Sequence, residues 1–123
     1  MRQSEDPVSG HLMDLPPEEV PGLPGIEKRI VFGPERFWED YVMRCFTIHP
    51  GGRVPLHHHE WPHYILVLQG RAAMTASGEE REIAPFSWAH VPPGSEHAFQ
   101  PAGEEPLVFI CIVPREGDQP PKS

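Results

Sequence analysis

Hydrophobic and polar residues alternate along this chain in short runs, and the apolar runs are rich in β-branched and aromatic residues. Glycine, proline and small polar residues separate the runs, a pattern typical of antiparallel sandwiches and barrels. We predict nine strands, at residues 29–33, 41–49, 54–59, 63–69, 71–76, 81–83, 88–91, 97–100 and 107–113. A short helix is predicted at residues 34–40, because proline is tolerated in the first turn of a helix.

The two ends of the chain differ in composition from its centre. Residues 1–25 form a proline-rich arm with five acidic residues and few large apolar side chains, so this segment cannot build a core alone. We expect the arm to be extended or disordered, or to lie over its own domain or a partner subunit. Its apolar anchors would be Leu12, Met13, Leu15 and Leu23. Residues 26–114 form the predicted barrel domain, and residues 115–123 form a predicted disordered tail.

Composition and charge exclude several classes of protein. The 17 prolines and 11 glycines among 123 residues argue against a helical bundle. The net charge of -8 and the absence of a basic cluster argue against nucleic acid as a partner. The longest apolar stretches are far shorter than the roughly 20 residues that cross a membrane. The N-terminus also lacks the apolar segment of a signal peptide, so we predict a cytoplasmic protein.

The two cysteines, Cys45 and Cys111, each lie in an apolar run. Free cysteine commonly packs as a small hydrophobic residue, so we predict that both thiols belong to the core. A single disulfide between them is the alternative that the sequence leaves open.

Four of the eight histidines lie within seven positions. On a strand, side chains at i and i+2 project from the same face, so His57 and His59 converge while His58 points away. Pro62 interrupts the strand, because proline cannot donate in a central ladder, and a turn there would bring His63 back toward the same point. Neutral imidazoles are common ligands of transition metals. The pattern therefore predicts a metal site.

The spacing resembles the two motifs of the cupin family. The first motif, G-x5-H-x-H-x3-4-E-x6-G, is matched by Gly51, His57, His59, His63 and Gly70, with His63 in place of the glutamate. The second motif, G-x5-P-x-G-x2-H-x3-N, is matched by Pro92, Gly94 and His97, whereas Phe86 and Pro101 replace its glycine and asparagine. The three matched glycines are predicted to lie in turns that need positive φ.

The resemblance implies an all-β jelly-roll (cupin) β-barrel that binds one divalent transition metal, which would be Mn, Fe, Ni, Zn or Cu. The metal ligands that it implies are His57, His59, His63 and His97. Because a histidine replaces the family's carboxylate, such a site would be held by four neutral imidazoles and would favour an anionic ligand. A water molecule as the fourth ligand, with His63 at the barrel rim, remains the alternative.

Other residues have two interpretations at this stage. Arg44 would bind an anionic substrate if its face of the strand points inward, and the sequence does not decide that face. Several aromatic residues would either line a ligand pocket or pack in the core: Trp61, Tyr64, Phe86, Trp88 and Phe99. Glu60 is expected to be solvated, and His90 is expected at the surface or behind a ligand.

The function predicted from these residues is that of a metal-dependent enzyme acting on a small anionic molecule, of the isomerase, lyase or oxygenase type. The alternative is a non-catalytic protein that binds a small ligand or a sugar acid through the metal. No catalytic residue is assigned. Small cupins are commonly dimeric, so we also expect a homodimer in which the arm or an early strand pairs with the partner's sheet.

Overall fold

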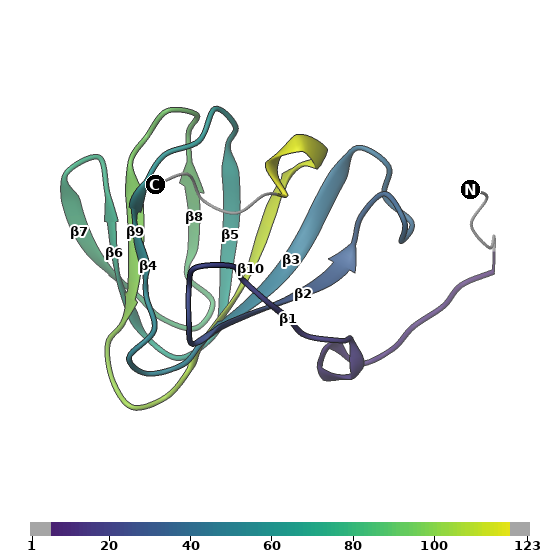
Figure 1. Ribbon diagram of the computed structural model, residues 1–123, viewed down its shortest axis with the longest axis horizontal. Coiled ribbons are helices and arrows are strands. Elements are labelled where there is room, and N and C mark those ends of the chain that lie inside the picture. Colours follow the sequence, from purple (N-terminus) through teal and green to yellow (C-terminus); the bar gives the residue numbers. More distant parts are fainter. Residues whose placement is uncertain (1–5, 119–123) are drawn as a thin grey trace.

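The computed structural model describes residues 6–118, which form two antiparallel sheets that face each other (Figure 1). One sheet has six strands in the order β1-β2-β3-β10-β5-β8, and the other has four in the order β4-β9-β6-β7. The strands are β1 (Glu18–Glu19), β2 (Ile26–Phe32), β3 (Tyr41–Ile48), β4 (Val54–His57), β5 (His63–Gln69), β6 (Ala72–Ala76), β7 (Glu79–Ile83), β8 (Trp88–Val91), β9 (His97–Pro101) and β10 (Leu107–Pro114). The fold is the all-β jelly roll that was predicted, and every predicted strand is present with small shifts at its ends.

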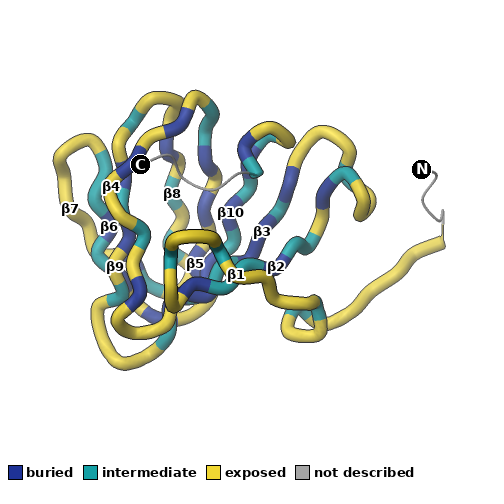
Figure 2. Tube along the Cα trace, in the orientation of Figure 1, coloured by how far each residue is buried: buried dark blue, intermediate teal, exposed yellow. Residues whose placement is uncertain are grey.

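The core lies between the two sheets, where alternate residues of each strand point inward. In β10, Leu107, Phe109, Cys111 and Val113 are buried, and the residues between them are only partly covered. The same alternation runs along β5 from His63 to Val67, and Figure 2 shows buried and exposed residues interspersed along the strands. Since successive side chains on a strand point to opposite faces, this pattern fixes which residues face the interior.

The predicted helix at residues 34–40 is wrong, because this segment is a tight turn between two paired strands. The amide of Arg36 donates to the carbonyl of Gly33, and the amide of Gly33 donates back to the carbonyl of Arg36. Phe37 has a φ of 71°, which is incompatible with a right-handed helix. The antiparallel pairing of β2 with β3 requires a reversal of the chain here. Within residues 6–118, no helix has the length and apolar character needed to cross a membrane.

Two turns adopt the left-handed conformation for different reasons. Gly70, between β5 and β6, has a φ of 80°, and a Cβ atom there would collide with the carbonyl oxygen of Pro106. Phe86, between β7 and β8, has a φ of 73° and is 83% exposed. Phe86 occupies the position of the first glycine in the second motif. The backbone there has a positive φ, which glycine adopts without strain.

Both terminal segments contact the barrel. β1 pairs with β2 of the same chain, and Nε of Arg29 donates to the carbonyl of Leu15 at 3.1 Å. After β10, the chain forms a 3-10 turn, η2 (Arg115–Gly117), in which Gly117 is buried against the indole of Trp61. The described structure therefore includes residues 115–118 of the segment predicted as a tail. Residues 1–5 and 119–123 of the two predicted end segments lie outside the described residues.

Candidate metal centre

The pairing of β4 with β9 brings two of the predicted histidines together. His57 and His97 are direct partners in the register of these strands. Because directly opposite residues share a face of the sheet, both side chains point into the barrel, and their ring centroids are 4.2 Å apart. Both residues are buried, with exposed fractions of 7% and 2%.

His59 reaches the same point from a loop. The strand predicted at 54–59 ends at His57, so the expectation that strand spacing positions His59 is wrong in detail. The loop is held instead by the amide of Gly94, which donates to the carbonyl of His59 at 2.7 Å. The imidazole of His59 also stacks on Trp61, with centroids 4.7 Å apart and planes inclined by 12°. The turn of the second motif thus supports a histidine of the first.

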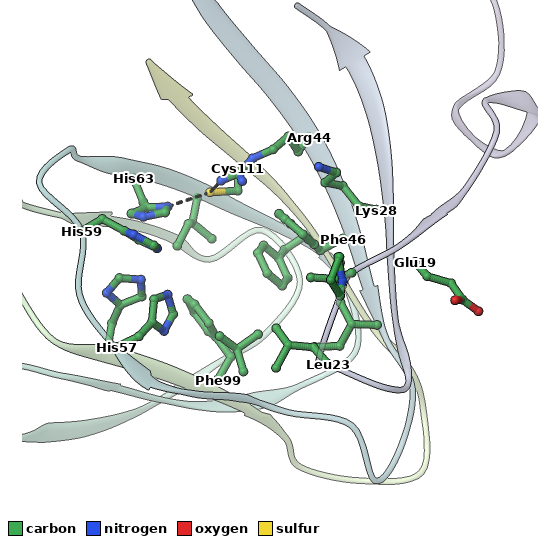
Figure 3. Close-up of a pocket in the computed structure, with 17 residues that line it drawn as sticks. Glu19, Leu23, Lys28, Arg44, Phe46, His57, His59, His63, Phe99 and Cys111 are labelled. Atoms are coloured by element: carbon green, nitrogen blue, oxygen red, sulfur yellow. Dashed lines mark hydrogen bonds between the residues drawn. The ribbon is translucent and has the colours of Figure 1, made fainter. Parts of the chain in front are cut away.

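His63 approaches from the opposite sheet, as the first residue of β5. Its ring centroid lies 4.9 Å from that of His97 and 5.1 Å from that of His59. Nδ1 of His63 lies 3.2 Å from Sγ of Cys111 on β10 (Figure 3). All four predicted histidines are therefore buried side by side between the two sheets.

The ligand atoms fit a single metal ion. Suitable atoms of His57, His59 and His97 all lie within 4.8 Å of one another. Zinc–nitrogen bonds of about 2.0–2.1 Å limit the separation of any two ligand atoms of one ion to about 4 Å, which is close to this spacing. His63 is not a member of this group of three, but its Nε2 is buried without a hydrogen-bond partner, as is Nδ1 of His59. A buried donor or acceptor left unpaired costs about 1–3 kcal/mol, and coordination to a metal would satisfy both nitrogens.

The histidines are held neutral, as metal ligands must be. Burial lowers the pKa of His59 and His97 to about 4 and the pKa of His63 to about 2. Burial also lowers the pKa of His57, although its hydrogen bond to Pro55 acts in the opposite direction. Desolvation disfavours the charged form of each ring, so no protons compete with a metal at neutral pH.

Hydrogen bonds behind the rings fix which nitrogen faces the centre. Nδ1 of His57 lies 2.7 Å from the carbonyl of Pro55, and Nδ1 of His97 lies 3.0 Å from the carbonyl of Ser95. A carbonyl only accepts, so both Nδ1 atoms carry the hydrogen and both Nε2 atoms keep a free lone pair. Partners of this kind orient metal-binding histidines in proteins generally.

The cluster forms one end of a cavity of about 80 Å³ between the sheets (Figure 3). This volume is several times the 10–15 Å³ that one water molecule requires. Its walls are mainly apolar, with Phe46, Phe99 and Phe109 among them. Residues of the N-terminal segment, including Val20 and Leu23, close one side. A small molecule in this cavity would contact the histidines directly.

The face of Arg44, which the sequence left open, is the inner one. Arg44 is 4% exposed and lines the cavity, with Nη2 3.1 Å from Sγ of Cys111. Lys28 also lines the cavity, and its Nζ donates to Oδ1 of Asp118 at 3.1 Å. Nη1 of Arg44 lies 3.7 Å from the same carboxylate oxygen. The histidine-lined cavity therefore also carries two cations.

The other residues considered from the sequence lie mostly outside the site. The four histidines outside the cluster, His11, His49, His58 and His90, are exposed, and so is Glu60. Of the five aromatic residues considered from the sequence, only Phe99 is both a core residue and a lining residue. Trp61 supports the site through His59, whereas Tyr64, Phe86 and Trp88 are exposed at the surface.

Sequence reasoning missed the roles of Lys28 and Cys111, which line the cavity, and of Asp118, whose carboxylate pairs with Lys28 and Arg44. Lys28 falls one residue before the predicted strand 29–33, and a strand begun at Ile26 would have placed it on the inner face. Cys111 was predicted as a core thiol, and it is free and buried. Its contacts with His63 and Arg44 join β10 to β5 and β3, so no local pattern in the sequence indicates them. No local signal in the sequence indicates the ion pairs of Asp118.

Comparison with known proteins agrees with the fold. Residues 44–113 match the family described as the cupin domain. A 1-methylthio-D-xylulose 5-phosphate methylsulfurylase from Rhodospirillum rubrum is 32% identical over 78 residues, which are 63% of this chain and 50% of that protein. A mannose-1-phosphate guanylyltransferase from Salmonella typhimurium is 33% identical over 76 residues, which are 60% of this chain and 16% of that protein. The chain thus spans half or less of the length of these curated relatives.

The solved structure of a polyketide cyclase from Streptomyces resistomycificus superimposes on the chain with a TM-score of 0.80 and 26% identity. The alignment covers 89% of this chain and 80% of that one. The family match extends over more than half of the 123 residues and contains the four buried histidines. The chain therefore belongs to the cupin family.

Proposed function

We propose that this protein is a metal-dependent enzyme that acts on a small anionic molecule, by chemistry of the isomerase, lyase or oxygenase type. The observation that carries the proposal is the position of the histidine cluster, which is buried, neutral and directly accessible from the cavity. We propose His57, His59 and His97 as ligands of one divalent transition metal, with His63 as the fourth.

A metal bound there would supply a Lewis acid that polarises and orients oxygen atoms of a ligand. The chain's own residues would provide the rest of the environment. The apolar wall, with Phe99 and Phe109, limits the water that reaches the centre and strengthens electrostatic interactions there. Four neutral imidazoles leave the charge of a divalent ion uncompensated, so an anion would bind more favourably than a neutral analogue.

The relatives support an enzyme without naming its substrate. The methylsulfurylase and the polyketide cyclase are both named as enzymes, and the first is named for a phosphorylated sugar derivative. The two free, buried thiols fit a reducing compartment such as the cytoplasm.

Metal uptake by histidine variants tests the proposed centre. Metal content would be measured by plasma mass spectrometry after the purified protein is dialysed against each divalent ion. We expect about one ion per chain in the wild type and none in His57→Ala or His97→Ala. His58→Ala is the matched control, because this exposed neighbour should leave uptake unchanged. Full occupancy in His57→Ala would contradict the proposed centre.

The role of His63 requires a separate measurement. If Nε2 of His63 is a ligand, His63→Ala should weaken metal affinity at least about tenfold, since a lost donor must be replaced by water. An unchanged metal affinity in His63→Ala would show that only three histidines bind the ion and that His63 lies beside it without coordinating it.

A non-catalytic binding protein is the second candidate, and one observation favours it. The one carboxylate-bearing residue that lines the described cavity is Glu19, and its side chain points away from the histidines (Figure 3). Among the lining residues that the structure describes, the histidines thus have no neighbouring carboxylate base. Titration of the metal-loaded protein with oxalate, followed by calorimetry and electron paramagnetic resonance, tests for open coordination positions. An unchanged spectrum and no heat at millimolar oxalate would contradict both candidates and indicate a structural site.

A further inference from the structure

The guanidinium group of Arg44 is buried with incomplete hydrogen bonding. Its Nε has no partner among the described residues, and Nη2 donates to a sulfur atom, which is a weak acceptor. Phe46 covers one face of the group, with the guanidinium carbon 4.9 Å from the ring centroid. Arginine stays protonated in proteins, so a permanent charge lies in an apolar wall with donors to spare. Such an arrangement is costly unless a ligand completes it.

The charges around Arg44 do not balance within the described part of the chain. Arg44 and Lys28 share the carboxylate of Asp118, whose side chain is 26% exposed. Glu19 also lines the cavity, but Figure 3 shows its carboxylate pointing away from both cations. Two cations therefore face one carboxylate, and the surplus is one positive charge. An incoming anion would neutralise it.

Apolar surface lies between these cations and the histidines. The rings of Phe46, Phe99 and Phe109 form one continuous stack, with neighbouring centroids 5.5 Å and 5.2 Å apart. All three rings line the cavity. On β10, two residues from Phe109, the sulfur atom of Cys111 contacts both Arg44 and His63, so a single atom separates these two polar groups. The cavity is thus polar at two points and apolar between them.

We propose that Arg44, with Lys28, anchors an oxyanion, and that the ligand of this protein is a carboxylate or phosphate with a small apolar body lying along the phenylalanine stack. The oxyanion would accept hydrogen bonds from the guanidinium, and the far end of the molecule would face the histidines. The planar fork of arginine binds either oxyanion in a bidentate manner. This inference rests on the proposed function for the role of the far end, but the anchor itself does not require a metal.

Calorimetric titration of the full chain, before and after removal of metal with a chelator, tests the anchor. The probes are 4-hydroxybenzoate for a carboxylate and phenyl phosphate for a phosphate, with neutral 4-hydroxybenzamide as the control ligand. We expect saturable binding of at least one anion in both forms and weaker or no binding of the amide. The tighter anion identifies which oxyanion the anchor prefers.

Three variants separate the anchor from general effects of charge. Arg44→Gln should weaken binding at least about tenfold, because a charge-assisted hydrogen bond is lost. Asp118→Asn should strengthen it several-fold, because the internal competitor for both cations is removed. Arg53→Gln changes the net charge equally at an exposed position and should leave affinity unchanged.

Three results from the wild type and Arg44→Gln would overturn the anchor. They are binding that disappears completely on chelation, equal binding of the amide, and equal affinity in Arg44→Gln and wild type. The first would show that anions bind only at the metal, and it would leave the proposed function intact. Near-ultraviolet circular dichroism checks that Arg44→Gln is folded. In Asp118→Asn, which changes a partly exposed residue, the affinity for the anion should rise instead of fall. An unchanged affinity in that variant also counts against the anchor.

Discussion

Sγ of Cys111 lies 3.2 Å from Nδ1 of His63, and the same sulfur accepts a hydrogen bond from Arg44 at 3.1 Å. Burial raises the pKa of the Cys111 thiol, although Arg44 acts in the opposite direction. The sulfur therefore orients His63 from behind, as the carbonyl oxygens of Pro55 and Ser95 orient His57 and His97. Mutation of residues in this role commonly lowers metal affinity about 10–100-fold, although these residues never touch the ion.

We predict that Cys111→Ala weakens metal affinity about tenfold, because His63 loses the partner that fixes its ring. Cys111→Ser should retain most of the affinity, since a hydroxyl group can take the place of the thiol. Cys45→Ala is the matched control, because Cys45 is also a buried thiol. Cys45 directly follows Arg44 in β3, so it faces the other side of the sheet. Competition with a metal-sensitive dye measures all three. Equal affinities in Cys111→Ala and Cys45→Ala would contradict the orienting role.

We predict that the metal-free protein loses stability as the pH falls from about 6.5 to about 4. Burial lowers the folded-state pKa of His59 and His97 to about 4, below the 6.5 of a solvated histidine, so the unfolded chain binds more protons in this window. The free energy of unfolding keeps its full value above pH 6.5. At pH 5 it is lower by about 2 kcal/mol for each of these histidines. Urea denaturation at pH 7.5 and pH 5 measures the loss. His58→Gln should show the same loss, and a free energy of unfolding independent of pH would contradict the burial argument.

We predict that Phe86→Gly stabilises the fold by up to about 1 kcal/mol. A left-handed backbone costs a residue with a Cβ atom about 1–2 kcal/mol, and glycine removes this strain but adds entropy to the unfolded chain. Little packing is lost, because Phe86 is 83% exposed. Phe86→Ala is the control, since it removes the ring but keeps the Cβ atom. Thermal or urea unfolding should rank glycine above alanine, and the reverse order would show that the φ of 73° is not strained.

The homodimer remains a prediction, and the outer face of β5 and β8 offers a surface for it. Tyr64, Leu66 and Trp88 are 46%, 41% and 79% exposed there, and Leu66 and Trp88 are direct partners in the register. We expect light scattering to give twice the 13.9 kDa mass of one chain. Trp88→Lys should shift the mass toward the monomer, because a charge would be buried in an apolar contact.

Leu56→Lys is the control for this measurement, since Leu56 is 56% exposed on the other sheet. A wild-type mass of 13.9 kDa at micromolar concentration would contradict the dimer. Deleting the segment before β2 tests the alternative, in which β1 leaves its own chain and pairs with the partner's sheet.

The sequence by itself determined the strands and the identity of the central histidines. Period-two alternation is a property of a short stretch of sequence. A strand such as Leu107–Pro114 can therefore be assigned without knowing which strands pair with it. The spacing of His57, His59, His63 and His97 matched the family motifs closely enough to place them together. The segment at 34–40 was assigned wrongly because the choice between helix and turn depends on the pairing of β2 with β3, which lies outside the segment.

Only the tertiary structure decided how the site is supported and what shares its cavity. His59 is held by Gly94 across a loop, and His63 by Cys111 on another strand. Arg44 has the same local sequence pattern whether it faces inward or outward, because a shift of one residue in register moves every side chain to the other face. The pairing of Arg44 with Cys111 fixes that register, and with it the cation inside the barrel. Contacts between residues distant in sequence are absent from any local pattern, so the histidines were predictable and their surroundings were not.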